Sequence, residues 1–226
     1  MLGSHPFLIN TVTSGAVVAE APALTPRTAS AESCAKDRDA SSAYSNECLY
    51  PNGKRLIKMF SNTTSGTQGF IAADDKRKEI IVAFRGSESI RDAYTDIQTN
   101  LVQFQTGTYV GPPTYIQSLT IIGGVLVHEG FLGAWNSVAF QIVEAIRPFP
   151  RDYIIVTTGH SLGGAIASLA GISLKVEFAR PLENFVVPLR IYTYGQPRTG
   201  SIEYARWINN VVGTSVMFRS VNANDW

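Results

Sequence analysis

The chain has 226 residues, of which 45% are hydrophobic and 16% charged, and its formal net charge is +1. This length and apolar content suffice for one substantial core and require no second domain. The charges are spread along the chain, so no basic stripe is available to neutralise a run of nucleic-acid phosphates. Apolar runs such as Ile121 to Val127 are strand-length and broken by glycine, far below the roughly 18 residues of a membrane-spanning helix. We therefore expect one soluble domain without a nucleic-acid partner.

The first thirty residues have the composition of an export or processing segment. Small residues from Ala16 to Ala23 are typical of the end of a secretory signal and its cleavage site, although residues 1–10 contain no Lys or Arg. We expect residues 1–30 to be a signal-like or pro-region segment without fixed structure. Residues 31–226 should then form the folded domain of a secreted protein.

Cys34 and Cys48 are the two cysteines of the chain, too few for a zinc ligand set. In an oxidising compartment they could pair with each other, or one could pair with a cysteine beyond Trp226; two unpaired thiols are the alternative. Asn62 begins an Asn-Thr-Thr triplet, the acceptor pattern for N-linked glycosylation. No phosphate loop, metal-ligand cluster or cofactor motif is present, so we expect neither a metal nor a cofactor.

The first half of the folded region has the alternation of β-strands. A short helix is expected at Ser41–Cys48, and strands are expected at Leu56–Phe60, Thr67–Ala72 and Glu79–Phe84. The turn residues Asp74, Asp75 and Lys76 predict that the last two strands form an antiparallel hairpin. The last strand is almost wholly apolar, as expected for a strand covered on both faces.

The second half changes to helical periodicity. Apolar residues from Leu132 to Ile146 recur on one face at 3.6-residue spacing, and Pro148 ends the pattern. The elements that follow are a strand at Tyr153–Thr158, a helix at Leu162–Val176, a strand at Pro188–Tyr194, a helix at Ile202–Asn209 and a strand at Ser215–Val221. Strands and helices alternate from Val125 onward, which predicts an α/β fold with a mostly parallel sheet and helices on both faces.

A Gly-x-Ser-x-Gly pattern lies at Gly159–Gly163, between a buried strand and a helix. A serine in this context occupies a sharp, strained turn, and small residues two positions away on either side avoid clashes. The turn lifts the Ser161 hydroxyl above the sheet edge, and the following helix N-terminus offers N–H groups to an oxyanion. The pattern therefore predicts Ser161 as a nucleophile; the alternative is a glycine-rich turn with an incidental serine.

Four sequence blocks occur in a fixed order, at Val82–Ser87, Val127–Phe131, Gly159–Gly164 and Tyr192–Gly200. Together they span most of residues 40–226 and resemble the class 3 (fungal triacylglycerol) lipase family, a branch of the α/β hydrolases. The resemblance implies a mostly parallel sheet flanked by helices, an N-terminal antiparallel hairpin and a short lid helix. It also implies hydrolysis of acylglycerol esters through an acyl-enzyme, without a cofactor.

The resemblance assigns roles to individual residues. The backbone N–H groups of Ser87 and Leu162 correspond to the oxyanion hole, although Ser87 could instead cap the turn at a strand end. Asp225 matches the acid of the catalytic triad, with an exposed terminal carboxylate as the alternative. By the same resemblance Arg85, His128 and His160 are structural residues.

The segment after Ser87 has its own pattern. Ile90, Ala93, Tyr94 and Ile97 repeat at i, i+3, i+4 and i+7, which predicts a short amphipathic helix. By resemblance this helix is a lid that covers Ser161 and moves away at a lipid–water boundary. The alternative is an ordinary surface helix packed permanently on the core.

The family's histidine follows the acid, whereas only Trp226 follows Asp225 here. The chain has three histidines, His5, His128 and His160, and none fits the role of general base. We therefore expect a C-terminally truncated form of a longer lipase. Three functions remain open: a monomeric triacylglycerol lipase acting at a lipid–water interface, a feruloyl-type or short-acyl esterase, and an inactive binder of lipid surfaces.

Overall fold

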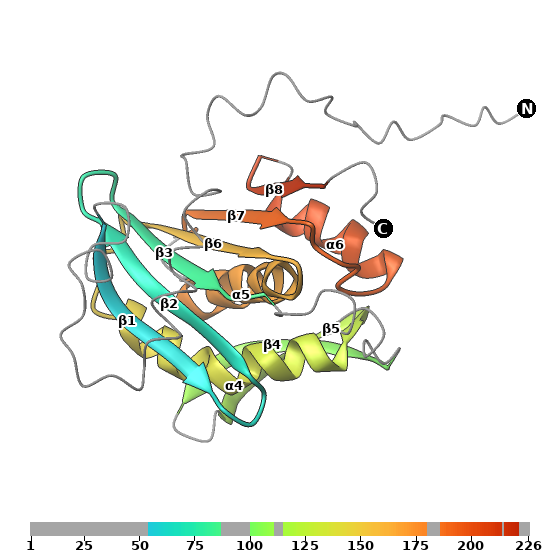
Figure 1. The fold of residues 1–226 in the computed structure, drawn as a ribbon. Helices are drawn as coiled ribbons and strands as arrows, with labels where there is room; N and C mark the ends of the chain where they lie inside the picture. The colour runs from blue at the N-terminus through green and yellow to red at the C-terminus, as the bar shows by residue number, and fades with distance from the viewer. Residues whose placement is uncertain (1–53, 87–99, 111–114, 180–185, 214, 222–226) are drawn as a thin grey trace, which may run out of the picture.

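The structure is a computed structural model that describes residues 54–86, 100–110, 115–179, 186–213 and 215–221. The strands are β1 (Arg55–Asn62), β2 (Thr67–Asp74), β3 (Glu79–Phe84), β4 (Leu101–Val110), β5 (Tyr115–His128), β6 (Ile154–His160), β7 (Leu189–Tyr194) and β8 (Met217–Ser220). The helices are α4 (Glu129–Ile146), α5 (Leu162–Phe178) and α6 (Ile202–Val212) (Figure 1). Every strand and helix predicted within the described ranges is present, with ends shifted by a few residues.

Six strands form one sheet in the order β1-β2-β3-β6-β7-β8. The first three are antiparallel neighbours, which confirms the predicted hairpin, whereas β3, β6, β7 and β8 run parallel. In the parallel part Phe84 aligns with Gly159, and Gly159 aligns with Thr193. The carboxyl ends of these strands therefore meet at one edge, the edge at which open parallel sheets carry their functional residues.

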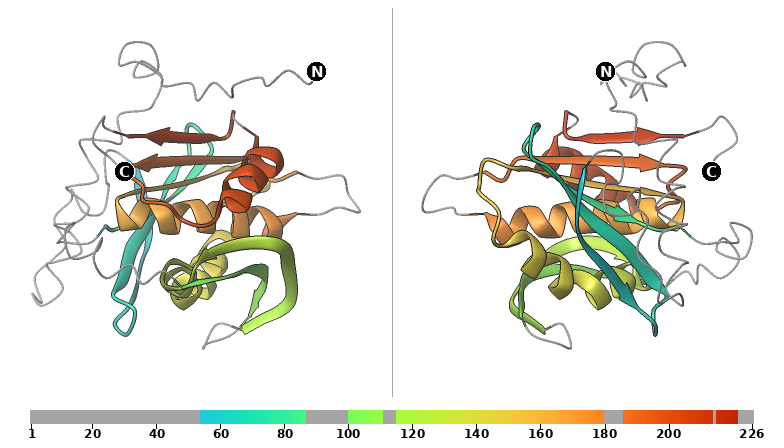
Figure 2. Two further views of the ribbon diagram at one scale, coloured as in Figure 1. Left: turned by 90° about the vertical axis from the view of Figure 1, so that its right-hand side faces the viewer. Right: turned by 60° about the vertical axis from the view of Figure 1, so that its left-hand side comes forward.

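The described helices lie on a single face of this sheet (Figures 1 and 2). Helix α4 packs against β1 and β2, and α5 packs against β3, β6 and β7. Helix α6 packs against β5, and its Tyr204 is bonded to Ser168 of α5. The alternation of strands and helices had predicted helices on both faces, so for the described residues that expectation is wrong. Periodicity identifies a helix but does not say which face of the sheet the crossing chain will take.

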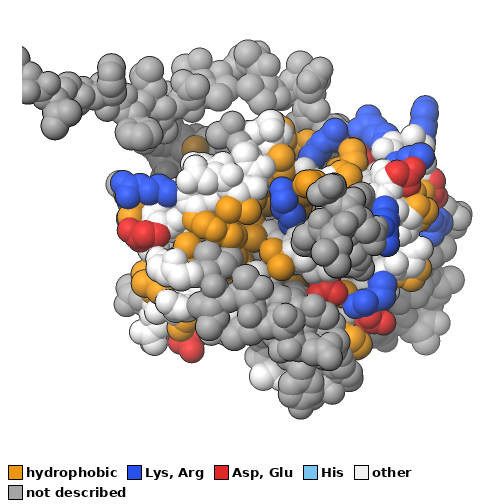
Figure 3. Space-filling view, turned by 180° about the vertical axis from the view of Figure 1, so that it is seen from behind, with side chains coloured by type: hydrophobic (Ala, Val, Ile, Leu, Met, Phe, Trp, Pro, Cys, Tyr) orange, Lys and Arg blue, Asp and Glu red, His pale blue; other side chains and the backbone are white. Residues whose placement is uncertain are grey.

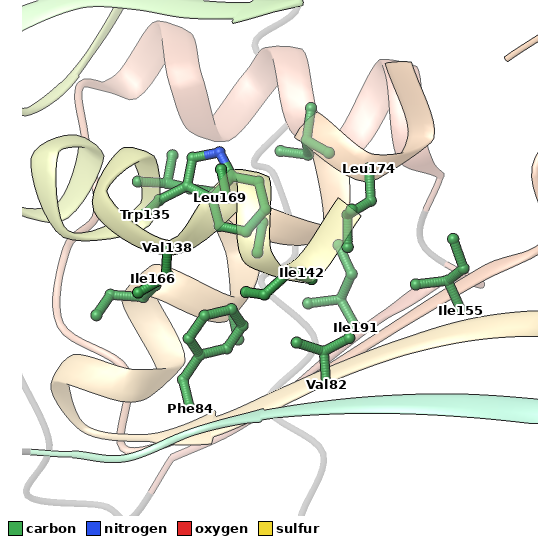
Figure 4. Packing of buried hydrophobic residues seen from close by; sticks show 14 of the residues in the cluster. Val82, Phe84, Trp135, Val138, Ile142, Ile155, Ile166, Leu169, Leu174 and Ile191 are labelled. Carbon is green, nitrogen blue, oxygen red and sulfur yellow. The ribbon is translucent and has the colours of Figure 1, made fainter. Parts of the chain in front are cut away.

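The core lies between the sheet and the helices α4 and α5. All six residues of β3 are buried, as the apolar run predicted. In Figure 4 Val82, Phe84 and Ile191 point from the sheet toward Trp135 on α4 and Leu169 on α5. The Phe84 ring lies 5.3 Å from that of Phe60 and 6.3 Å from that of Trp135. Close packing of these rings fixes β3 in the middle of the fold.

A separate two-stranded ribbon, β4 with β5, was not predicted. Its register breaks between Gln103, which faces Leu126, and Gln105, which faces Ile121. The additional residues of β5 are accommodated at Gly124, whose φ is 76°. Figure 2 shows this ribbon curving around one side of α4. The bulge breaks the alternation on which strand prediction depends, so the two strands do not stand out in the sequence.

A buried polar contact joins α5 to α6. The hydroxyls of Ser168 and Tyr204 share a hydrogen bond of 2.7 Å, and both side chains are buried. Burial raises the pKa of the Tyr204 phenol above its ordinary value, so this group stays neutral. The ring of Phe104 on β4 meets the rings of Tyr204 and Trp207 edge-on. These contacts hold α6 against α5 and the ribbon.

The surface in Figure 3 mixes acidic and basic side chains. Exposed ion pairs join Arg55 to Asp75 at 3.1 Å and Lys78 to Asp152, near the turn between β2 and β3. This turn lies at the opposite end of β3 from the edge where the parallel strands finish. Among the residues that the structure describes, no helix is both long and apolar enough to cross a membrane.

The link between α5 and α6 predicts a difference between single and double substitutions. Ser168→Ala leaves the buried Tyr204 hydroxyl without its partner and should lower the free energy of unfolding by about 1–2 kcal/mol. Adding Tyr204→Phe removes the unpaired hydroxyl and should recover most of the lost stability. Urea unfolding of the native chain and of the two variants measures the effect. A double variant at least as unstable as Ser168→Ala would show that the hydroxyl pair is not what stabilises this contact.

Candidate active site

Ser161 occupies the sharp turn between β6 and α5. Its φ is 53° and its ψ is −125°, a conformation that costs a non-glycine residue about 1–3 kcal/mol. Lys78, in the β2–β3 turn, is the other non-glycine residue with positive φ in the described part of the chain. Strain of this kind persists only where the surrounding structure imposes it. The predicted sharp turn is therefore present at Ser161.

The two glycines of the Gly-x-Ser-x-Gly pattern are required by close backbone contacts. A Cβ atom on Gly159 would lie 2.3 Å from the backbone of Gly163. A Cβ atom on Gly163 would lie 2.4 Å from the carbonyl oxygen of Phe84 and 2.9 Å from that of Arg85. Neither contact can be relieved by moving a flexible side chain, because the atoms belong to the backbone. A side chain at Gly163 would force the turn away from β3, and one at Gly159 would force apart β6 and the first turn of α5.

The end of β3 passes beside Ser161. A Cβ atom on Gly86 would lie 2.7 Å from the carbonyl oxygen of His160 and 3.8 Å from Cβ of Ser161. Gly86 is therefore a second point at which only glycine fits without displacing backbone. The next residue, Ser87, lies outside the described residues. Its predicted role in the oxyanion hole remains a prediction.

The N-terminus of α5 supplies hydrogen-bond donors at the same place. The carbonyl oxygen of Ser161 accepts bonds from the N–H groups of Gly164 at 2.9 Å and Ala165 at 3.3 Å. Leu162 is the first residue of the helix, so its N–H has no acceptor one turn earlier. Such N-terminal N–H groups carry a partial positive charge. They can stabilise negative charge that develops on an oxygen next to Ser161.

The Ser161 side chain is enclosed but not hydrogen-bonded within the described structure. The residue is 4% exposed, and its Oγ makes no hydrogen bond with a described residue. His160, immediately before it, is exposed. His128 lies half-buried at the start of α4, where its ring packs on Phe131. The backbone N–H of His128 donates to the carbonyl oxygen of Thr199 at 3.0 Å.

The loop after β7 forms the other side of the site. The N–H of Ser161 donates to the carbonyl oxygen of Tyr194 at 2.9 Å, so the Ser161 turn is attached directly to the end of β7. The side chain of Gln196 is buried, and its Nε2 donates to Oγ1 of Thr199 at 2.6 Å. No role was predicted for Gln196 or Thr199, although both lie in the sequence block Tyr192–Gly200. What could have pointed to these two residues is their position in the block, where polar residues directly follow a buried strand.

The titratable groups that the structure describes near the turn are few. Burial raises the pKa of the Tyr194 phenol, so this side chain is neutral near pH 7 and cannot take a proton from Ser161. No group of three His, Cys, Asp or Glu side chains with metal-binding geometry occurs among the described residues. The described site therefore consists of a hydroxyl on a strained turn and backbone N–H donors beside it.

Several predicted site residues lie outside the described residues. These are the four lid positions Ile90, Ala93, Tyr94 and Ile97, the acid Asp225, and the two cysteines Cys34 and Cys48. The helix expected at Ser41–Cys48 and the signal-like segment at residues 1–30 also lie there. All of them remain predictions.

Asn62 is described, and its amide is already engaged. Its Oδ1 accepts hydrogen bonds from the N–H groups of Thr64 and Ser65, and its Nδ2 donates to the carbonyl oxygen of Ser137 at 3.3 Å. The side chain thus shapes the β1–β2 turn and attaches it to α4. A glycan on Nδ2 would occupy the position of the bond to Ser137. Glycosylation of Asn62 remains a prediction of the triplet alone.

The contact between Gly163 and β3 predicts opposite effects at two helical glycines. Gly163→Ala should lower the free energy of unfolding by several kcal/mol, because its Cβ meets backbone oxygens that cannot move separately from the sheet. Gly133→Ala is the matched control, since no atom lies within 4 Å of its added Cβ and it sits inside α4. That variant should gain about 0.5–1 kcal/mol from helix propensity. Chemical denaturation of both variants tests this, and equal effects would contradict the close approach at Gly163.

Comparison with known proteins identifies relatives of this chain. The family model for lipase (class 3) matches residues 81–226. A lipase from Rhizopus niveus is 33% identical over 179 residues, covering 77% of this chain and 40% of the relative. Secreted mono- and diacylglycerol lipase 1 from Fusarium solani is 32% identical, covering 75% of this chain and 44% of the relative. The chain thus spans less than half the length of these two relatives.

A solved lipase structure has a similar fold. A triacylglycerol lipase whose catalytic centre is formed by a serine protease triad superimposes with a TM-score of 0.56 at 29% sequence identity. The match covers 75% of this chain and 57% of that one. The fold is that of the α/β hydrolases, with the strained serine at the expected point between a parallel strand and a helix. The chain belongs to the class 3 lipase family.

Proposed function

We propose that the protein is a serine ester hydrolase that cleaves acylglycerols through an acyl-enzyme formed on Ser161. The single observation that carries the proposal is the strained backbone of Ser161 at the N-terminus of α5, where the parallel strands end. A serine without a function would gain stability by relaxing, or by replacement with glycine, at this position. A serine at this strained position is explained if its hydroxyl takes part in a reaction.

The chemistry follows from the positions of the described groups. Ser161 Oγ attacks the carbonyl carbon of the ester, the electron pair of the C=O bond moves to oxygen, and the hydroxyl proton passes to a base. The Leu162 N–H, with the proposed partner Ser87 N–H, stabilises the oxyanion. Collapse expels the alcohol with a proton, and water then hydrolyses the acyl-enzyme. We propose Asp225 as the acid that orients a triad histidine, and we assign no histidine of this chain to that role.

The substrate class is supported by the relatives. One is a mono- and diacylglycerol lipase described as secreted, and one is a triacylglycerol lipase. An apolar lid at Ile90, Ala93, Tyr94 and Ile97 would favour esters presented at a lipid–water interface, which we propose as the site of action. We also propose that the protein is secreted and acts as a monomer, consistent with the small-residue segment from Ala16 to Ala23.

Replacing the nucleophile tests the proposal. The purified protein should react with a fluorophosphonate probe at Ser161, and Ser161→Ala should abolish labelling and lower ester hydrolysis by at least about a thousandfold. Ser215→Ala is the matched control, because Ser215 is exposed and lies outside the turn; it should leave both signals unchanged. Peptide mapping of the labelled protein identifies the modified residue.

The choice of ester separates the related functions. A lipase should hydrolyse emulsified tributyrin faster than the same ester below its solubility limit, whereas a feruloyl-type or short-acyl esterase should prefer dissolved substrates. A folded protein that neither reacts with the probe nor hydrolyses either ester would overturn the enzymatic proposal and favour an inactive binder of lipid surfaces.

A further inference from the structure

Two buried side chains beside the first turn of α5 each have a polar atom without a hydrogen-bond partner. Thr193 on β7 is 0% exposed, and Gln196 in the loop that follows is 4% exposed. In the described structure neither Oγ1 of Thr193 nor Oε1 of Gln196 is hydrogen-bonded. Folded proteins pair almost all of their buried polar groups, and they use water where no protein atom is in reach. These two oxygens therefore require a partner.

The two side chains flank one position on α5. A Cβ atom on Gly164 would lie 3.4 Å from Cβ of Thr193 and 3.2 Å from Cβ of Gln196. Ile191 points from β7 toward the helices (Figure 4), and the alternation of side chains along a strand places Thr193 on the same face. Across the ladder Thr193 aligns with Gly159 of β6, which has no side chain that could pair with the hydroxyl. Both side chains thus begin between the end of β7 and the first turn of α5.

The other bonds of Gln196 show that its Oε1 needs a separate donor. Its Nε2 donates to Oγ1 of Thr199 at 2.6 Å, and that hydroxyl donates to the carbonyl oxygen of Pro197 at 3.4 Å. The single hydroxyl proton of Thr199 is therefore already used. An amide oxygen only accepts hydrogen bonds, whereas a hydroxyl both donates and accepts. The missing partner must donate to Oε1 of Gln196 and can bond Oγ1 of Thr193 in either sense.

The surrounding charge and chemistry favour a neutral partner. Arg219 aligns with Thr193 on the neighbouring strand, and its Nη2 donates to the carbonyl oxygen of Gln196 at 2.7 Å. A positive guanidinium at this place disfavours a bound cation. An anion would face Oε1 of Gln196, which has no proton to donate to it. A water molecule is neutral and has two protons to donate, so it meets both requirements.

We propose that Thr193 and Gln196 bind one buried water molecule, which joins the end of β7 to the loop after it. Buried waters of this kind typically make about three hydrogen bonds with protein groups. The water lies close to the attachment of the Ser161 turn, because the carbonyl oxygen of Tyr194, which follows Thr193, accepts the N–H of Ser161. Binding of water here requires no reaction at Ser161, so it is measured without catalysis.

A high-resolution crystal structure of the full chain tests the proposal directly. An ordered water should lie within about 3.2 Å of both Oγ1 of Thr193 and Oε1 of Gln196. The proposal is overturned if either oxygen is bonded to a protein atom instead, or if no water lies within this distance of both.

The sign of a stability change gives a second test. Thr193→Val replaces the hydroxyl with a methyl group of similar size. Loss of a bonded hydroxyl should lower the urea midpoint of unfolding by roughly 0.5 M, whereas removal of an unpaired buried hydroxyl should raise it. Thr157→Val is the matched control, because Thr157 is buried on the adjacent strand and its Oγ1 donates to the carbonyl oxygen of Ala167 at 2.9 Å. A midpoint that falls for Thr157→Val but rises for Thr193→Val would contradict the water site.

A double-mutant cycle tests whether the two side chains share one water. Gln196→Met removes the amide and should also lower the midpoint, partly through the lost bond to Thr199. If one water serves both residues, the variant carrying Thr193→Val and Gln196→Met should lose less stability than the two single losses together. Strictly additive losses would show that the two oxygens act separately and that the shared site is wrong. If Gln196→Met does not fold, the crystal structure and Thr193→Val still decide.

Discussion

The close contact between the Ser161 turn and the end of β3 is the constraint on which the site depends. Backbone atoms of Gly86, Gly159 and Gly163 approach one another and the strand end so closely that a Cβ atom at any of the three would meet backbone. Ser161, which lies within this packing, has a φ of 53°. Because both sides of the contact are backbone, the turn cannot relax without moving β3, and β3 is buried at every residue.

The helices on one face of the sheet support that contact. Helices α4 and α5 cover the face of the sheet that carries Phe84, and the Ser168–Tyr204 hydrogen bond joins α6 to α5. The loop after β7 lies against the same turn, since the carbonyl oxygen of Tyr194 accepts the N–H of Ser161 and Gln196 packs beside the first turn of α5. In the described part of the chain strand β8 contacts this loop at its end, where Arg219 Nη2 donates to the carbonyl oxygen of Gln196.

Membership of the class 3 lipase family places these contacts in a wider context. The match with the family begins within β3, so it includes the strand end, the Ser161 turn and the loop after β7. These are the segments that the structure brings to one edge of the sheet. The family resemblance and the geometry therefore point to the same edge from independent observations, one from the order of sequence blocks and the other from backbone contacts.

The sequence by itself determined the hairpin, the parallel strands, their helices and the turn at Ser161, because each is specified by a local pattern of apolar residues and glycines. It did not determine the β4–β5 ribbon, whose bulge at Gly124 interrupts the alternation of its residues. Nor did it determine that the described helices share one face, or that Arg219 meets Gln196. Those features bring together residues far apart in the chain, and only tertiary packing decides which distant segments meet.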